Sequence, residues 1–188
     1  MLKSAVVLVG MALACLTTPT PTKPERLLKE SKISLPEAVE KAIPELKEGS
    51  PVSAKLREEK DRILYLVDIA QGETATRMSI DARTQEIVSK TPLKKNYSKL
   101  IGASKLSLNK LVGIATAKVA GKASRISLGL KKGNPVAEVI VFKDGKLFEV
   151  KINAVTGSVI KVEEDDDDDD DGDEDDGDDG DDDEDDDD

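Results

Sequence analysis

The chain has 188 residues, a formal net charge of −11 and only 2% aromatic residues, with no tryptophan and no histidine. The lack of histidine excludes histidine-based acid–base catalysis and histidine metal sites, and the single cysteine excludes an intrachain disulfide. No paired carboxylates or activated lysine stand out from the surface charge. The composition therefore predicts small aliphatic cores and a protein that is not an enzyme.

The N-terminus has the pattern of an export signal. Lys3 precedes an uncharged apolar run from Ala5 to Leu13, with small residues at Ala12 and Ala14. This order is typical of a secretory signal peptide, here residues 1–14, and the run is too short for a stable transmembrane helix. We therefore expect an exported protein of the cell envelope, the periplasm or the extracellular space.

Cys15 follows this signal and leaves two alternatives open. In the first, Cys15 is the lipidation site of a bacterial lipoprotein, and residues 15–32 form a Pro/Thr-rich tether and lead-in. In the second, ordinary cleavage after Ala14 leaves a free thiol. The lipoprotein pattern prefers leucine three residues before the cysteine, where this chain has Ala12.

Residues 33–90 and 106–162 contain the same order of patterns at an offset of 72–73 residues. Each segment opens with apolar residues spaced i, i+3, i+4, i+7 and i+11, which predicts an amphipathic helix. A serine stands at each N-cap, and Ser34 with Glu37 has the spacing of a capping box. The apolar stripes are Leu35, Ala38, Val39, Ala42 and Leu46 in the first segment, and Leu108, Leu111, Val112, Ala115 and Val119 in the second.

After each helix the hydrophobic period changes to two, which predicts β-strands. Asp144-Gly145 is a strong two-residue hairpin signal in the second segment. The predicted fold class is α+β: two small domains, each one helix packed on a three- to four-stranded antiparallel sheet. Residues 91–105 are the predicted linker between the domains, and residues 163–188 are the predicted disordered acidic tail.

The closest match between the two segments lies at their ends. Residues 80–88 read IDARTQEIV and residues 152–160 read INAVTGSVI. With this ending after a helix and an extended meander, each segment resembles the PepSY domain. The resemblance implies an exported bacterial protein without catalytic activity and a possible role in modulating peptidases, because PepSY domains occur in propeptides of secreted peptidases. The first segment departs from the pattern at Gln85, where glycine is expected, and the second at Asn153, where aspartate is expected.

The family-signature turn comprises Asp81 and Thr84 in the first segment and Asn153, Thr156 and Gly157 in the second. One interpretation is structural: the side chains bond the nearby backbone, and glycine permits a positive φ. The other interpretation makes this loop the rim of a ligand site. The structural interpretation is the favoured one.

Charge is distributed unevenly along the chain. Residues 163–188 contain 23 acids and no base, whereas residues 92–162 contain 14 bases and three acids. We therefore expect the tail to contact the basic second domain within the same molecule. The scarcity of aromatic residues and the export signal argue against a nucleic-acid partner. Contact with a membrane is expected only through a lipid anchor on Cys15.

The tail also contains a superficial match to a calcium-binding loop. Its candidate metal ligands are Asp167, Asp169, Asp171 and Asp178. Helices do not flank this stretch and its twelfth position is not glutamate, so only weak Ca²⁺ or Mg²⁺ association is expected, with no cofactor. Two functions follow. The first is a binding or regulatory module that contacts an unknown envelope protein or peptide, and the alternative is a divalent-cation-associating protein whose tail is the functional element.

Overall fold

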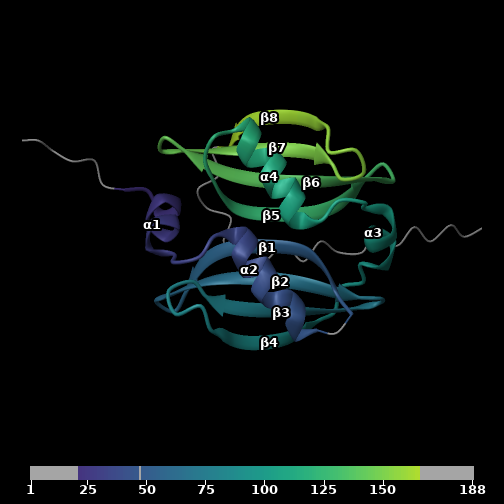
Figure 1. Ribbon diagram of the computed structural model, residues 1–188, viewed down its shortest axis with the longest axis horizontal. Helices are drawn as coiled ribbons and strands as arrows, with labels where there is room; N and C mark the ends of the chain where they lie inside the picture. Colours follow the sequence, from purple (N-terminus) through teal and green to yellow (C-terminus); the bar gives the residue numbers. More distant parts are fainter. Residues whose placement is uncertain (1–20, 47, 166–188) are drawn as a thin grey trace, which may run out of the picture.

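The computed structural model describes residues 21–46 and 48–165. In this part of the chain, eight antiparallel strands form one sheet in the order β4-β3-β2-β1-β5-β6-β7-β8, and α2 and α4 lie side by side on one of its faces (Figure 1). The predicted α+β class is confirmed. The helices are α1 (Lys23–Glu30), α2 (Leu35–Ala42), the 3₁₀ helix η1 (Ile43–Glu45), α3 (Ser98–Ala103) and α4 (Leu108–Lys118). The strands are β1 (Ser50–Glu59), β2 (Arg62–Gln71), β3 (Thr74–Asp81), β4 (Ile87–Leu93), β5 (Lys122–Lys131), β6 (Asn134–Lys143), β7 (Lys146–Asn153) and β8 (Val159–Asp165).

The helix α2 starts where the sequence predicts and ends earlier. Its capping box is present: the Ser34 hydroxyl accepts from the Glu37 N–H, and the Glu37 carboxylate accepts from the Ser34 N–H at 2.6 Å. The prediction that the helix continues to Leu46 is wrong. Pro44 has no N–H to donate and its ring crowds the preceding turn, so the chain tightens into η1 after Ala42.

The core lies between the sheet and the helices α2 and α4, and it is continuous across both halves of the sheet. The inward side chains of β2 and β6 pack beneath the apolar stripes of α2 and α4 in one hydrophobic cluster. Tyr65, the largest fully buried side chain, donates its hydroxyl to the Ile33 carbonyl at 3.0 Å. Burial raises the pKa of Tyr65 to about 12, and the hydrogen bond satisfies its polar end.

The half-sheet β1–β4 and the half-sheet β5–β8 have the same arrangement. Their strands begin at residues 50, 62, 74 and 87 and at residues 122, 134, 146 and 159, so each strand starts 72 residues after its counterpart, as 122 − 50 shows. The helices α2 and α4 start 73 residues apart, at residues 35 and 108. We call two residues counterparts when they are separated by these offsets.

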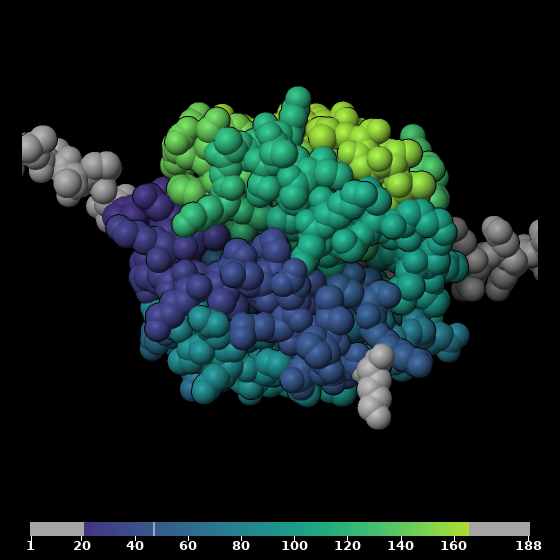
Figure 2. All heavy atoms as spheres, in the orientation of Figure 1, coloured from purple at the N-terminus to yellow at the C-terminus, as the bar shows by residue number. Residues whose placement is uncertain are grey.

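An approximate twofold axis relates the two halves. β1 and β5 pair through Ser53↔Ser127, Ala54↔Ile126 and Lys55↔Arg125, so Ala54 pairs with its own counterpart. At the level of the helices, the Asn109 side chain donates to the Pro36 carbonyl at 3.3 Å, and these two residues are also counterparts. This self-complementary pairing has the geometry of an isologous interface. In Figure 1 the axis runs roughly toward the viewer, and Figure 2 shows the atoms of the two halves meeting across the middle of the molecule.

Two further helices connect the halves. α1 lies within the predicted lead-in and α3 within the predicted linker, and neither helix was predicted from the sequence. α1 contacts β1 and β5, and α3 contacts β2, β5 and β6, so each helix touches both halves. Leu27 and Leu28 of α1 and Leu100 of α3 are buried by these contacts. In the described part of the chain, no helix has the length and apolar character needed to cross a membrane.

Candidate functional site at the seam between the halves

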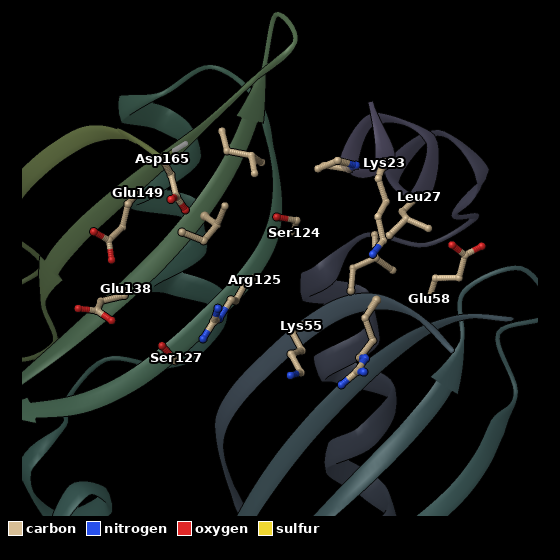
Figure 3. A pocket seen from close by; sticks show the side chains of 15 residues that line it. Lys23, Leu27, Lys55, Glu58, Ser124, Arg125, Ser127, Glu138, Glu149 and Asp165 are labelled. Atoms are coloured by element: carbon tan, nitrogen blue, oxygen red, sulfur yellow. The ribbon is translucent and has the colours of Figure 1, made fainter. Parts of the chain in front are cut away.

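β1 and β5 are each ten residues long, but only three residue pairs join them. On the α1 side of these pairs the two strands diverge around a cleft with a volume of about 340 Å³, which we call the seam cleft (Figure 3). α1 and both halves of the sheet contribute to its walls. The charged residues that line it are Lys23, Lys55, Arg57 and Arg125, and Glu58, Glu138, Glu149 and Asp165.

Strand geometry explains why cations gather at the seam. Along β1, Lys55 and Arg57 alternate with Ala54 and Leu56, which pack in the core under the helices. Successive side chains of a strand point to opposite faces, so the two cations project from the face that α2 and α4 leave uncovered. Arg125, paired with Lys55 across the seam, follows the same rule on β5.

Charged residues of the cleft also pair with groups outside its lining. The Arg57 guanidinium lies 3.3 Å from the Glu59 carboxylate, and three of the four cleft carboxylates have cation partners. Glu58 accepts from Arg26 at 2.6 Å, which lowers the pKa of Glu58. Glu149 lies 2.5 Å from the Lys151 ammonium, and Glu138 forms an ion pair with Lys131. The partners Arg26, Lys131 and Lys151 do not belong to the cleft lining. Figure 3 shows Lys55 and Arg125 between β1 and β5, with Glu138, Glu149 and Asp165 grouped on the second half.

The other end of the seam is filled instead of open. There, Val52, Ala70, Ala75 and Leu100 form an apolar cluster, against which Leu93, Tyr97 and Leu128 pack. This cluster, which we call the filled end, is the twofold counterpart of the seam cleft. The counterparts of Val52, Ala75 and Leu93 are Ser124, Leu147 and Asp165, and all three line the seam cleft.

A buried ion pair adjoins the filled end. Arg77 donates two hydrogen bonds to Asp68, at 2.7 and 3.0 Å, and the Ser53 hydroxyl donates to the same carboxylate at 3.0 Å. Asp68 is only 3% exposed. Its counterpart in the second half is Ile140, and the counterpart of Arg77 is Glu149. The second half therefore cannot form this network, and the corresponding positions line the seam cleft.

The family-signature residues form two equivalent turns. The Asp81 side chain accepts from the N–H groups of Arg83 and Thr84 at 2.9 and 3.0 Å. The Asn153 side chain accepts from the corresponding two N–H groups of its own turn at the same distances. These backbone donors lower the pKa of Asp81, because they stabilise the carboxylate.

The last position of each turn has a positive φ, 68° at Gln85 and 79° at Gly157. The Thr84 and Thr156 hydroxyls accept from the N–H groups of the second residue after each. These bonds are the ones that the structural interpretation requires. Neither turn contributes a residue to the seam cleft.

The lipidation candidate Cys15 and the candidate metal ligands Asp167, Asp169, Asp171 and Asp178 lie outside the described residues. Among residues 21–46 and 48–165, no cluster of three or more histidine, cysteine, aspartate or glutamate side chains could hold a metal ion.

The seam cleft was not predicted from the sequence. Its cations sit in alternating strands, where lysine and arginine ordinarily mark a solvated face. A usable signal was available: at the 72-residue offset, polar residues such as Ser124 and Asp165 replace Val52 and Leu93. Such replacements within a repeated pattern indicate positions whose surroundings differ between the two copies.

Comparison with known families identifies the second half. Residues 105–163 match the family model described as PepSY, the peptidase propeptide and YPEB domain. The chain therefore contains a PepSY domain that spans α4 and most of β5–β8, and the predicted resemblance is confirmed for this segment. No curated protein matches the chain.

Two solved structures are similar to this chain. One is a candidate lipoprotein from Clostridium difficile 630, with 18% identity and a TM-score of 0.46, covering 72% of this chain and 95% of that one. The other is the YpeB C-terminal domain of Bacillus megaterium, with 16% identity and a TM-score of 0.30, covering 71% of this chain and 66% of that one.

Proposed function

We propose that the protein is an exported, non-catalytic binding module of the cell envelope, in which two PepSY-like domains hold a segment of a protein or peptide at the seam cleft. The N-terminal signal pattern supports export, and the family match supports a PepSY-type, peptidase-related module. The first half has the same order of helix and strands as the matched half, which supports a second domain of the same kind.

The seam cleft is the observation that carries the binding role. Its volume of about 340 Å³ is at the lower end of the range typical of ligand sites, roughly 300–1,000 Å³. Its walls are charged, with cations from α1, β1 and β5 and carboxylates from β1, β6, β7 and β8. Charged walls of both signs are suited to a polypeptide that carries charged side chains. Because both halves form the cleft, a bound segment would also restrict how they move relative to each other.

Affinity capture from native envelope tests this function. The full chain is compared with K55Q/R57Q, which removes two cleft charges and keeps long side chains, and with K110Q/K118Q, which removes two exposed charges from α4. We expect saturable capture of a defined polypeptide by the wild type and by the α4 variant, and a loss of at least tenfold in affinity for the cleft variant. Equal capture by all three proteins would contradict the assignment of the site.

Lipid anchoring is tested separately through Cys15. If Cys15 is lipidated, the native protein should partition with membranes, and Cys15→Ser should release it into the soluble fraction. An unmodified Cys15 at the mature N-terminus, seen by mass spectrometry, would reject lipidation and leave export intact.

A further inference from the structure

A second cavity lies on the face of the sheet that the helices cover. It has a volume of about 430 Å³ and is lined by the α1–α2 connection, the start of α2, the middle of α4 and the start of β5. We call it the helix-side pocket. α1 separates it from the seam cleft, since Leu27 lines the cleft and its neighbour Leu28 lines the pocket. The two cavities share no lining residue.

The walls of the helix-side pocket are mostly apolar and come from both halves of the molecule. The buried apolar residues that line it are Leu28, Ile33, Leu35, Val112 and Ala123. All but Leu28 belong to the hydrophobic cluster of the core. The same packing that stabilises the fold therefore fixes the shape of this pocket.

A glycine leaves one wall of the pocket bare. Gly113 of α4 lines it, and a β-carbon at this position would have no atom within 4 Å. The counterpart of Gly113 in α2 is Glu40, whose carboxylate accepts from the Asn109 side chain at 3.0 Å. The first half thus has a long side chain at the position where the second half has none, and this difference opens the surface of α4.

The charged residues that line the pocket are both lysines, Lys32 and Lys122, and they are exposed at its rim. Within the part of the chain that the structure describes, neither ammonium group forms an ion pair. Two carboxylates of α2 are held elsewhere and do not line the pocket: Glu37 accepts from the Ser34 N–H, and Glu40 accepts from Asn109. The charge of the pocket therefore has one sign, whereas the seam cleft holds both signs in equal number. An anionic ligand complements it.

Polar groups between the lysines and the apolar walls are available as acceptors. The hydroxyls of Ser31 and Thr116 line the pocket and donate to the Leu27 and Val112 carbonyls at 2.7 and 2.9 Å. Their protons are thus committed, and their oxygens retain lone pairs that can accept from a ligand N–H. A hydrocarbon chain would leave such groups without a partner, which costs free energy. A ligand with a peptide N–H suits them better.

These features define the class of ligand. It carries an anionic group for the lysines, an apolar group for the walls and an uncharged N–H for the hydroxyl oxygens. A free amino acid does not fit, because its ammonium group would lie beside two lysines. The C-terminal residue of a polypeptide fits, because its carboxylate adjoins its side chain and its nitrogen is an amide. Water occupies about 30 Å³ in the liquid, so the volume corresponds to about 14 groups of this size, enough for the last one or two residues of a chain.

We propose that the helix-side pocket binds the C-terminal residue of a partner polypeptide that ends in an apolar side chain, with the terminal carboxylate at Lys32 and Lys122. Capture of a terminal carboxylate is one of the recurring modes of peptide recognition. The proposal is independent of the function assigned to the seam cleft, because it rests on different residues.

Short peptides test the proposal on the full chain. The probe is acetyl-Gly-Ser-Gly-Leu with a free carboxylate, and its controls are the same peptide with a C-terminal amide and a peptide that ends in serine. In NMR titrations we expect the probe to shift the amide signals of Val112, Gly113 and Ala123 saturably, and each control to bind at least tenfold more weakly. Equal affinity for the carboxylate and the amide peptide, or no saturable shift at these residues at millimolar concentration, would overturn the proposal.

Charge variants locate the carboxylate. K32Q/K122Q keeps long side chains and should bind the probe at least tenfold more weakly than the wild type. K110Q/K118Q removes two exposed lysines of α4 that do not line the pocket and should bind it equally well. Amide spectra that otherwise superimpose on those of the wild type will show that both variants fold. If K32Q/K122Q binds the probe as tightly as the wild type, the two lysines do not hold the carboxylate and the proposal is wrong.

A second pair of variants fills the pocket without removing any charge. Gly113→Glu introduces the side chain of the counterpart Glu40 into open space, and a helix interior favours glutamate over glycine, so the variant should fold. It should abolish the shifts caused by the probe, whereas Gly113→Ala adds one methyl group and should change the affinity little. Equal binding by all three proteins would place the peptide outside the pocket.

Decanoate distinguishes a lipid from a polypeptide as the ligand. It carries a carboxylate on an apolar chain but has no N–H for the hydroxyl oxygens of Ser31 and Thr116. We expect it to bind more weakly than the probe. Tighter binding of decanoate, with shifts at the same residues, would identify a lipid site and overturn the assignment to a polypeptide terminus.

Discussion

The two ends of the seam are made from corresponding residues of the same fold, yet one is closed and the other is open. At the filled end, α3 covers an apolar cluster, and a buried Asp68–Arg77 pair adjoins it. At the seam cleft, Ser124 and Asp165 replace Val52 and Leu93, the other counterparts include the apolar Leu27, Ile140 and Leu147, and a cavity remains under α1. The two ends share one backbone arrangement. A few side-chain differences therefore make one of them a packed contact between the halves and the other a candidate binding site.

This comparison also indicates where stability is concentrated. Burial of one large apolar side chain contributes roughly 1.5–3 kcal/mol, so the closed cluster stabilises the contact between the halves more than the open cleft does, where Ser124 and Asp165 replace Val52 and Leu93. We therefore expect the filled end to hold the halves together. The seam cleft can then accept charged side chains without a large cost in folding free energy.

The largest expected effect lies in the core that the halves share. Leu111 of α4 is fully buried, whereas its counterpart in α2 is the smaller Ala38. Leu111→Ala should cost roughly 2–5 kcal/mol of unfolding free energy, measured by urea denaturation, because it leaves a cavity. Lys110→Ala on the exposed side of the same helix is the control and should be nearly neutral. Equal costs at the two positions would refute the register of α4.

The next effect compares the two ends of the seam directly. Asp68→Ala should cost about 2–3 kcal/mol, because it removes the acceptor for both Arg77 and Ser53 in a buried position. Its counterpart Ile140 lines the open cleft and is only partly buried, so Ile140→Ala should cost about 1 kcal/mol. A larger loss for the Ile140 variant would show that the cleft, and not the filled end, joins the halves.

The sequence predicted the elements of each half but not how the halves join. Periodic stripes such as the one through Val112 identify helices because only one face of each is buried. β2 shows the limit of this reasoning. Its outward residues, including Leu64 and Leu66, are buried too, and α3 contacts this strand. A seam of three residue pairs around Ala54 and Ile126 has no local pattern of its own, so its cleft could not be located without the structure.

A smaller effect, of opposite sign in the two halves, is expected at the family-signature turns. Gln85 and its counterpart Gly157 both have positive φ values. A residue with a side chain is strained there by about 1 kcal/mol relative to glycine. Gln85→Gly should therefore stabilise the protein by up to about 1 kcal/mol, and Gly157→Ala should destabilise it by about 1 kcal/mol or more.

Packing adds to the cost of Gly157→Ala. A β-carbon there would lie 3.0 Å from the Ile114 side chain and 3.2 Å from that of Leu106. Thermal unfolding of the two variants and the wild type measures both changes. The same sign for both variants would mean that the turns are not equivalent.

The smallest effect concerns pH and the residues that begin these turns, Asp81 and Asn153. Backbone N–H groups lower the pKa of Asp81 in the folded protein. The carboxylate therefore contributes stability that is present above the pKa of an unfolded aspartate, about 3.9, and that is lost as the pH falls through the lower folded value. Asn153 accepts the same two hydrogen bonds without a charge, so its turn should not respond to pH.

The exchange of these two residues tests this difference. Asp81→Asn keeps both acceptor bonds, and should lose less stability between pH 7 and pH 3 than the wild type does. Asn153→Asp should lose more, because it adds a second carboxylate of the same kind. Urea unfolding of the three proteins at both pH values isolates the two turns, since every other carboxylate is common to all of them. The three proteins could instead lose the same unfolding free energy between pH 7 and pH 3. In that case the charge of Asp81 adds nothing to the hydrogen bonds from the backbone N–H groups, and the pH dependence of stability arises from other carboxylates.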